Sequence, residues 1–136
     1  MSETKMLQVL LISPGEEPKV VEISDELSEM QRLVGGYIQE IMPFDDEVAL
    51  VCNEEGKFRG LPLNRAIRDE KGEIMDIIAG DFFLCSAPIM SESFESLSKE
   101  QIKKYQNKFR NPEQFIIRDD GMEVRSVTKK NREMER

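Results

Sequence analysis

The chain has 136 residues, which predicts one domain with a core that needs neither metals nor disulfides. No apolar run approaches the roughly 20 residues of a membrane span. The N-terminus lacks the pattern of a signal peptide, so we expect a cytoplasmic protein. The sequence has no histidine, which excludes His-based general bases, Ser-His and Cys-His nucleophile pairs and His-ligated metals.

The charge of the chain is strongly acidic and unevenly spread. The formal net charge is -8, and residues 1–117 alone carry 13 basic and 22 acidic residues, a net of -9. Such a field repels phosphate backbones, so direct binding to nucleic acid is not expected. The same field attracts basic surfaces, including those of enzymes that bind nucleic acids. The ordinary alternative is that the acidic residues serve solubility.

The first third of the chain predicts a hairpin followed by a helix. Residues 6–13 are mostly apolar and end at a Pro-Gly turn, and residues 19–23 read as the antiparallel partner strand. Ser24 is a suitable N-cap, and two acidic residues follow it in the first turn. We expect this helix to end at the Gly35-Gly36 pair.

The middle of the chain predicts short strands separated by turns. Residues 37–42 and 47–52 are expected to be strands, and residues 53–56 a turn that leads to a return strand at 57–60. Residues 61–67 break the alternation and are expected to form a loop or a single helical turn. A second turn at 69–72 leads into a strand at 73–78.

The last third predicts a buried strand, a helix and a hairpin. Residues 82–85 form the strand, and Ser98 with Gln101 forms a capping box at the start of a helix that ends before Pro112. Residues 115–118 and 122–127 flank an Asp-Gly turn.

The predicted class is therefore α+β, with a mostly antiparallel sheet, two main helices and a C-terminal hairpin. We divide the chain into a compact domain at 1–115 and a hairpin with a polar tail at 116–136.

Two cysteines and the many acidic residues give no sign of a metal site. Cys52 and Cys85 lie in apolar runs, so we expect buried free thiols rather than a disulfide. No calcium loop is present, and we expect neither a metal nor another cofactor.

The acidic residues at turns are the candidates for binding a protein. The ordinary interpretation is that they only shape the turns, where Asp and Glu are common. The candidates are Asp45, Asp46, Glu47, Asp69, Glu70 and Glu73.

Asn53, Arg59, Asn64 and Arg65 form the second candidate group, for a small ligand. Arginines in irregular segments can clamp a carboxylate or a phosphate with two hydrogen bonds. The alternative is that Arg65 pairs with a neighbouring acid and has only a structural role.

Four stretches of the sequence together resemble an uncharacterised family of small proteins from Firmicutes, their plasmids and their phages. They are LVGGYIQEI, LVCNEEGKFRGLPLNRAI, DIIAGDFFL and LSKEQIKKYQNKF with its following Pro, within residues 6–115. The resemblance implies an accessory gene of a mobile element and transfers no catalytic residues. Small phage accessory proteins often act against host defences, an inference from genetic context.

The sequence therefore predicts a non-enzymatic accessory protein that binds and inhibits a host defence protein. Its acidic surface would steer it onto a basic groove, in one version as a mimic of DNA. The alternative is a binder that sequesters a nucleotide signal. An enzyme that uses carboxylates, Lys, Tyr or Cys is a third hypothesis, and a domain with only an internal host or plasmid-maintenance role is a fourth. Formation of homo-oligomers through strand edges stays open.

Overall fold

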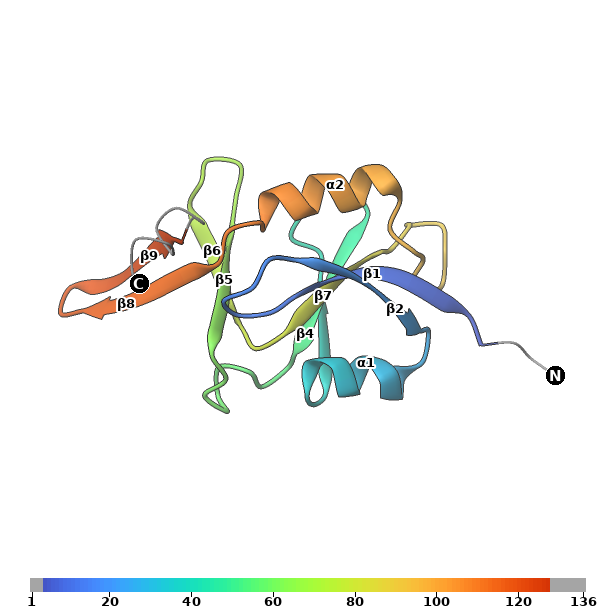
Figure 1. The fold of residues 1–136 in the computed structure, drawn as a ribbon, viewed down its shortest axis with the longest axis horizontal. Coiled ribbons are helices and arrows are strands. Elements are labelled where there is room, and N and C mark those ends of the chain that lie inside the picture. Colours follow the sequence, from blue (N-terminus) through green and yellow to red (C-terminus); the bar gives the residue numbers. More distant parts are fainter. Residues whose placement is uncertain (1–3, 128–136) are drawn as a thin grey trace.

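The computed structural model describes residues 4–127, which form the predicted α+β fold with mostly antiparallel strands (Figure 1). The strands are β1 (Met6–Ile12), β2 (Lys19–Ser24), β3 (Ile38–Ile41), β4 (Val48–Asn53), β5 (Leu63–Arg68), β6 (Ile74–Ala79), β7 (Phe82–Ser86), β8 (Glu113–Arg118) and β9 (Gly121–Ser126). The helices are α1 (Leu27–Val34) and α2 (Lys99–Lys108).

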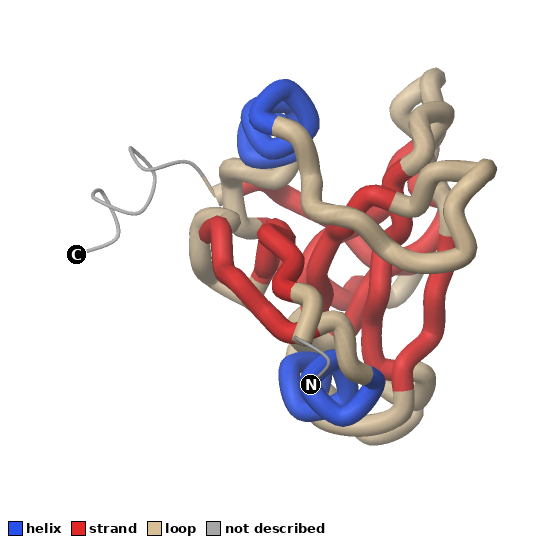
Figure 2. The backbone as a smooth tube through the Cα atoms, turned by 90° about the vertical axis from the view of Figure 1, so that its right-hand side faces the viewer, coloured by secondary structure: helices blue, strands red, loops and turns tan. Residues whose placement is uncertain are grey.

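The centre of the molecule is a five-stranded sheet in the order β2-β1-β7-β4-β3, with every neighbouring pair antiparallel. The two helices cover opposite faces of this sheet, as the turned view shows (Figure 2). The β5–β6 hairpin packs on the same face as α2. The architecture therefore has three layers: α1, the sheet, and α2 with β5–β6.

Side chains alternate between the two faces of the sheet, and both faces are buried. In β7, Phe82 and Leu84 pack toward α2, while Phe83 and Cys85 pack toward α1. Burial on both faces explains why β1, β4 and β7 read as nearly continuous apolar runs rather than alternating ones.

Helix α1 begins later than its sequence predicts. Ser24 is the last residue of β2, where it pairs with Met6, so it cannot cap the helix. Glu26 takes the N-cap position without a side-chain hydrogen bond. The predicted end is confirmed: Gly35 has a left-handed conformation (φ 79°), and its N–H donates to the carbonyl of Gln31.

The predicted return strand at residues 57–60 is wrong. Both edges of β4 are already paired, one with β3 and the other with β7, so no strand can be added beside it. The chain instead forms tight turns, in which the N–H of Arg59 donates to the carbonyl of Glu55 at 2.8 Å. After these turns the chain reaches the face of the central sheet that α2 covers, and β5 begins there.

The expected loop or helical turn at residues 61–67 is also wrong, because residues 63–67 belong to β5. Its polar pair Asn64 and Arg65 broke the apolar pattern that marks a strand, yet both side chains are buried at 1% exposure. Their polar groups find internal partners, which lets them occupy core positions. The turn predicted at 69–72 is confirmed between β5 and β6.

Helix α2 has the predicted capping box: Ser98 Oγ accepts from the N–H of Gln101, whose side chain accepts from the N–H of Ser98. Tyr105 is the buried residue of the helix, and Phe109 is buried at its C-cap. Together they seat α2 on the sheet.

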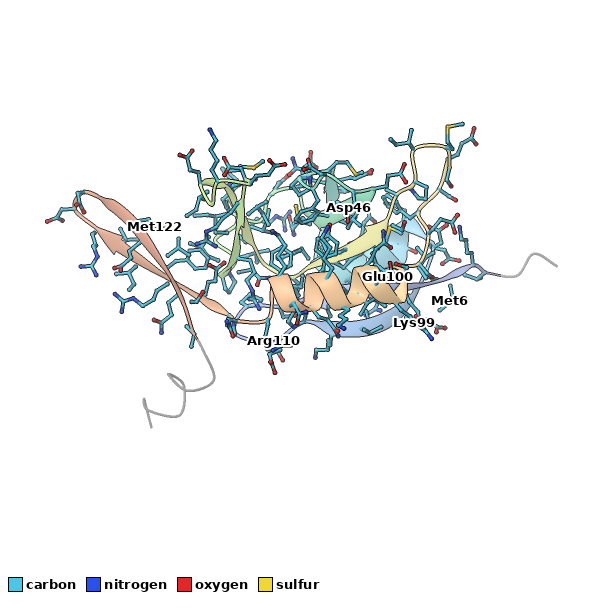
Figure 3. All side chains as sticks on the ribbon, turned by 90° about the horizontal axis from the view of Figure 1, so that it is seen from above. Met6, Asp46, Lys99, Glu100, Arg110 and Met122 are labelled. Carbon is cyan, nitrogen blue, oxygen red and sulfur yellow. The ribbon has the colours of Figure 1, made fainter. Side chains whose placement is uncertain are left out.

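The C-terminal hairpin β8–β9 extends from one end of the body, as the view from above shows with Met122 on it (Figure 3). Glu113 attaches it to β5: one carboxylate oxygen accepts from the N–H of Ala66 at 2.8 Å and the other from Arg68 at 3.1 Å. The boundary that we placed between residues 115 and 116 falls inside β8. Residues 128–136 of the predicted tail lie outside the described part. Within residues 4–127, neither helix has the length and apolar character that a bilayer crossing requires.

Candidate functional site

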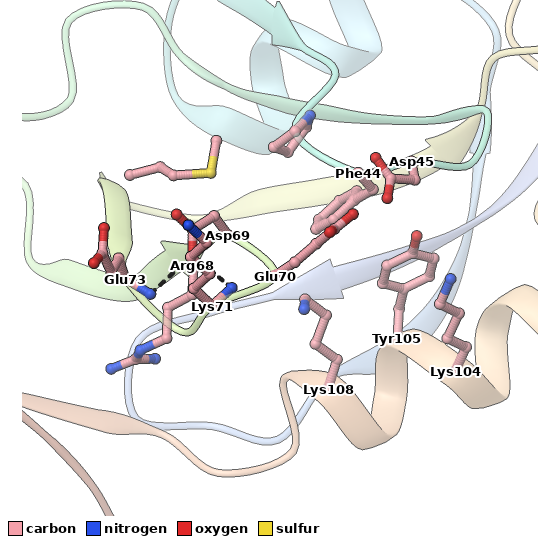
Figure 4. Close-up of a pocket in the computed structure, with 12 residues that line it drawn as sticks. Phe44, Asp45, Arg68, Asp69, Glu70, Lys71, Glu73, Lys104, Tyr105 and Lys108 are labelled. Carbon is pink, nitrogen blue, oxygen red and sulfur yellow. Dashed lines mark hydrogen bonds between the residues drawn. The ribbon is translucent and has the colours of Figure 1, made fainter.

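A cleft of about 560 Å³ lies between α2, the loop before β4 and the turn between β5 and β6 (Figure 4). We call it the α2 cleft. It brings together four of the six predicted protein-binding acids, which come from two turns far apart in the sequence. Its lining residues are Pro43, Phe44, Asp45, Arg68, Asp69, Glu70, Lys71, Glu73, Met75, Lys104, Tyr105 and Lys108.

The acidic side of the cleft is formed by Asp45 and Glu70, whose side chains approach each other near the ring of Phe44. A hydrogen bond with Asp45 raises the pKa of Glu70, and the negative charges of Asp45 and Asp69 raise it further. Like charges disfavour a second ionised carboxylate at the same place. The fold therefore holds two carboxylates together against their repulsion.

The opposite side of the cleft comes from α2 and carries cations that already have partners. The Lys104 ammonium lies 3.2 Å from a carboxylate oxygen of Asp46 and 5.2 Å from the centroid of the Tyr105 ring. The Lys108 ammonium lies 5.8 Å from the centroid of the Phe44 ring. Neither lysine forms an ion pair with Asp45 or Glu70 within the described residues.

Asp46 does not line the cleft but ties its walls together. Its carboxylate accepts hydrogen bonds from the Tyr105 hydroxyl and from Lys104, which join the loop before β4 to α2. Burial raises the pKa of Asp46, but these two hydrogen bonds, the charge of Lys104 and a backbone hydrogen bond together lower it below its usual value. Burial and the same carboxylate raise the pKa of Tyr105 strongly. Asp46 thus links the loop before β4 to α2 at the edge of the cleft.

Of the other three predicted acids, Asp69 and Glu47 have structural partners. One carboxylate oxygen of Asp69 accepts from the N–H groups of Lys71 and Glu73, each at 2.9 Å, and shapes the β5–β6 turn. Glu47 accepts from the N–H of Ile89 at 3.0 Å, on the far side of the sheet from the cleft. Glu73 lines the cleft and is exposed.

The four predicted ligand-binding residues do not form one site. Asn53 is buried, donates to the carbonyl of Val34 at the end of α1 and accepts from the N–H of Glu55. Arg59 is exposed and pairs with Glu55 at 3.3 Å. Asn53 therefore fixes the end of α1, while Arg59 lies in a surface turn.

Asn64 and Arg65 lie side by side in β5, where Arg65 Nη1 donates to Asn64 Oδ1 at 2.9 Å. Asn64 donates to the carbonyls of Ile12 and Gly80. Arg65 also donates to the carbonyls of Phe109 at 2.9 Å and Glu16 at 2.6 Å. Burial lowers the pKa of Arg65 to about 10, a shift that the charge of Glu113 partly opposes, so the guanidinium stays charged at neutral pH. These donors are engaged by the protein itself.

The cysteines are free and buried, as predicted. Burial is the main cause that raises the pKa of Cys52 to about 11 and that of Cys85 to about 12. Both therefore stay protonated near neutral pH, and a protonated thiol is a weak nucleophile. In the part of the chain that is described, no three His, Cys, Asp or Glu residues are placed to hold a metal ion.

Sequence reasoning missed the α2 side of the cleft. Tyr105 lies on the buried face of the helix, where an aromatic residue is expected to serve packing, and Phe44 lies in a short loop with no periodic pattern. The spacing of Lys104 and Lys108, four residues apart on one helix, places them on the same face and was a usable signal. The sequence does not indicate that this face of α2 lies opposite the turn at residues 69–72.

The comparison with protein families matches residues 6–110, from the start of β1 to just past α2, to DUF3846, a domain of unknown function. The chain belongs to this family. The match includes the α2 cleft and stops before the C-terminal hairpin of this DUF3846 protein. Neither the curated proteins nor the solved structures gave a match to the chain.

Proposed function

We propose that this DUF3846 protein is a non-enzymatic binding protein whose α2 cleft receives a Lys or Arg side chain of a basic partner protein. The observation that carries the proposal is the convergence of Asp45 and Glu70 on one wall of the cleft. A cation placed between the two carboxylates would remove their repulsion and add charge-assisted hydrogen bonds.

The two lysines on the α2 side of the cleft are engaged elsewhere, which leaves room for a cation of a partner between Asp45 and Glu70. Lys104 is held by Asp46, and Lys108 lies over the ring of Phe44. Within the described residues, no Lys or Arg forms an ion pair with Asp45 or Glu70. The surrounding acidic field would steer a basic surface toward it.

A role without catalysis is supported by the state of the reactive groups. The thiols of Cys52 and Cys85 are buried with raised pKa values. The hydroxyl of Tyr105 donates to Asp46 and has a raised pKa. None of these groups is activated as a nucleophile or a base in the way that catalysis requires.

The partner on this proposal is a host protein with a basic surface, such as an enzyme that binds nucleic acids. An origin in a phage or mobile element and inhibition of a host defence are further expectations of the same proposal. We favour a specific carboxylate pair over a mimic of DNA, because the cleft is lined by four acidic and four basic residues and so lacks a single sign of charge. The nucleotide sponge stays a prediction, whose four residues do not gather in one cavity.

The test is the affinity for a fluorescein-labelled peptide of alternating lysine and glycine, measured by anisotropy at low salt. The wild type is compared with the double variant Asp45→Asn/Glu70→Gln, which removes the carboxylate pair. The matched control is Glu17→Gln/Glu22→Gln, which removes the same charge from exposed positions on the β1–β2 hairpin, away from the cleft.

We expect the cleft variant to weaken binding about tenfold, because it removes the two carboxylates that a lysine of the peptide contacts directly. The control should weaken binding less than about twofold, because its exposed charges act on the peptide only from a distance. Equal weakening by both variants would show that the peptide senses only net charge, and the proposal would then be wrong. Circular dichroism of both variants checks that they are folded.

A further inference from the structure

A second hollow, of about 610 Å³, lies on the other face of the sheet between α1, β3 and the loop at 87–94. We call it the α1 groove. Its floor and walls are largely apolar, with Leu27 and Met30 from α1 and Phe94 from the loop. Because the central sheet separates the two faces, the groove is independent of the α2 cleft (Figure 2).

The groove exposes apolar side chains that a folded protein normally covers. Leu27 is 57% exposed, Met42 is 47% exposed and Ile89 is 80% exposed. Met90, next to Ile89 on the same loop, is 96% exposed. Single exposed apolar residues are ordinary, but several that gather around one hollow are typical of an interaction surface.

The loop that forms one wall is held in place before any partner arrives. Ser86 and Glu95 close its base through a β-bridge, and Lys5 donates to the carbonyl of Phe94 at 2.9 Å. At the other end, Glu47 accepts from the N–H of Ile89 at 3.0 Å. A preformed loop loses little conformational freedom on binding, so its apolar side chains contribute more of their burial to affinity.

The charges of the lining distinguish this groove from the α2 cleft. Three acidic residues, Asp25, Glu40 and Glu92, line the α1 groove, and no basic residue does. Apolar surface with an acidic rim is complementary to a segment that carries both apolar and basic side chains.

We propose that the α1 groove is a second docking surface, which binds a segment of another protein with apolar side chains flanked by Lys or Arg. This goes beyond the function proposed above, because it lies on the opposite face and depends on apolar burial as well as charge. The protein would then contact its partner, or two partners, on both sides of the sheet.

The test compares two peptides of equal length and charge: the lysine–glycine peptide and one in which leucine replaces glycine. The groove variant is Leu27→Ser/Ile89→Ser, at two exposed positions where loss of folding is not expected. The control is Phe58→Ser, which removes an apolar side chain that is 91% exposed and lies outside the groove.

We expect the wild type to bind the leucine–lysine peptide more tightly than the lysine–glycine peptide. The groove variant should lose about tenfold in affinity for the former only, and Phe58→Ser should lose less than about twofold. Equal affinity of the wild type for the two peptides, or an equal loss in Phe58→Ser, would overturn the proposal. So would sedimentation showing that the groove variant abolishes a dimer, since the occupant would then be a second copy. Asp45→Asn/Glu70→Gln must leave the preference for leucine intact, which separates this test from that of the α2 cleft.

Discussion

Replacing Arg65 with methionine tests whether this residue is structural, as its contacts indicate, or a ligand-binding residue. The guanidinium is buried at 1% exposure and joins three parts of the chain that are distant in sequence. It donates to the carbonyl of Phe109 at the end of α2, to that of Glu16 in the β1–β2 turn, and to Asn64 beside it. Methionine has a similar length and no donors, so it removes these bonds without leaving a large cavity.

The expected loss follows from the carbonyls that would be left without a donor. Each buried polar group without a partner costs about 1–3 kcal/mol, and two buried acceptors, the carbonyl of Phe109 and the side-chain carbonyl of Asn64, lose theirs. The variant also no longer buries a charged guanidinium. The desolvation penalty of that charge is therefore absent, which offsets part of the loss of stability. We therefore expect Arg65→Met to lower the free energy of unfolding by about 3 kcal/mol.

Urea unfolding followed by far-ultraviolet circular dichroism measures this loss, because the chain has no tryptophan for fluorescence. With an m-value of about 1.5–2 kcal/mol/M, the midpoint should fall by about 1.5–2 M. The control is Arg59→Met, at an exposed residue whose ion pair with Glu55 contributes about 0–1 kcal/mol. A loss of less than about 1 kcal/mol in Arg65→Met would refute the structural role.

Two further predictions concern a tight backbone approach and a repulsive charge pair. Gly56→Ala should lower the free energy of unfolding by about 1–3 kcal/mol in the same urea assay, because a Cβ at this position would lie 2.6 Å from the carbonyl oxygen of Ala79. Glu70→Gln should raise the melting temperature at pH 7, because it removes a carboxylate whose pKa is raised by a hydrogen bond with Asp45 and by repulsion from the negative charges of Asp45 and Asp69. The raised pKa means that protonation of Glu70 relieves this repulsion in the wild type. The difference in melting temperature between the variant and the wild type should therefore shrink as the pH falls through that pKa. An equal difference at pH 7 and pH 4 would contradict the reasoning.

The elements that could be predicted are those specified by neighbouring residues. The capping box of Ser98 and Gln101 fixed the start of α2, and Gly35 fixed the end of α1. The β1–β2 hairpin followed from two apolar runs around a Pro-Gly turn. In each case the deciding interaction spans only a few residues, so the sequence displays it directly.

The predictions that were wrong have one cause in common: they depend on contacts between segments that are distant in the sequence. Nothing near residues 57–60 reveals that β4 has both edges occupied by β3 and β7. Similarly, Arg65 looks like a surface residue because its partners Phe109 and Glu16 lie far away in the sequence. A buried polar residue can be recognised only when its partners are known.

The candidate site was predictable on one side. The two acidic turns were singled out, and the structure places Asp45 and Glu70 together. Their separate roles were not predictable: Asp46, next in the chain, bonds to Tyr105, and Glu47 bonds to the loop of the α1 groove. Three consecutive acids thus point to three different neighbours, a distinction that depends on the tertiary fold.

The contact of Glu113 with β5 shows that the folded unit extends beyond the last residue of the family match. The family match ends at residue 110, three residues before the side chain whose carboxylate covers the N–H of Ala66. Without it, the N–H of Ala66 would be unpaired on the edge of β5 that faces away from β6, and an open strand edge is a template for pairing between chains. A truncation designed on the family boundary alone would remove Glu113 and so leave this edge of β5 without its side-chain partner.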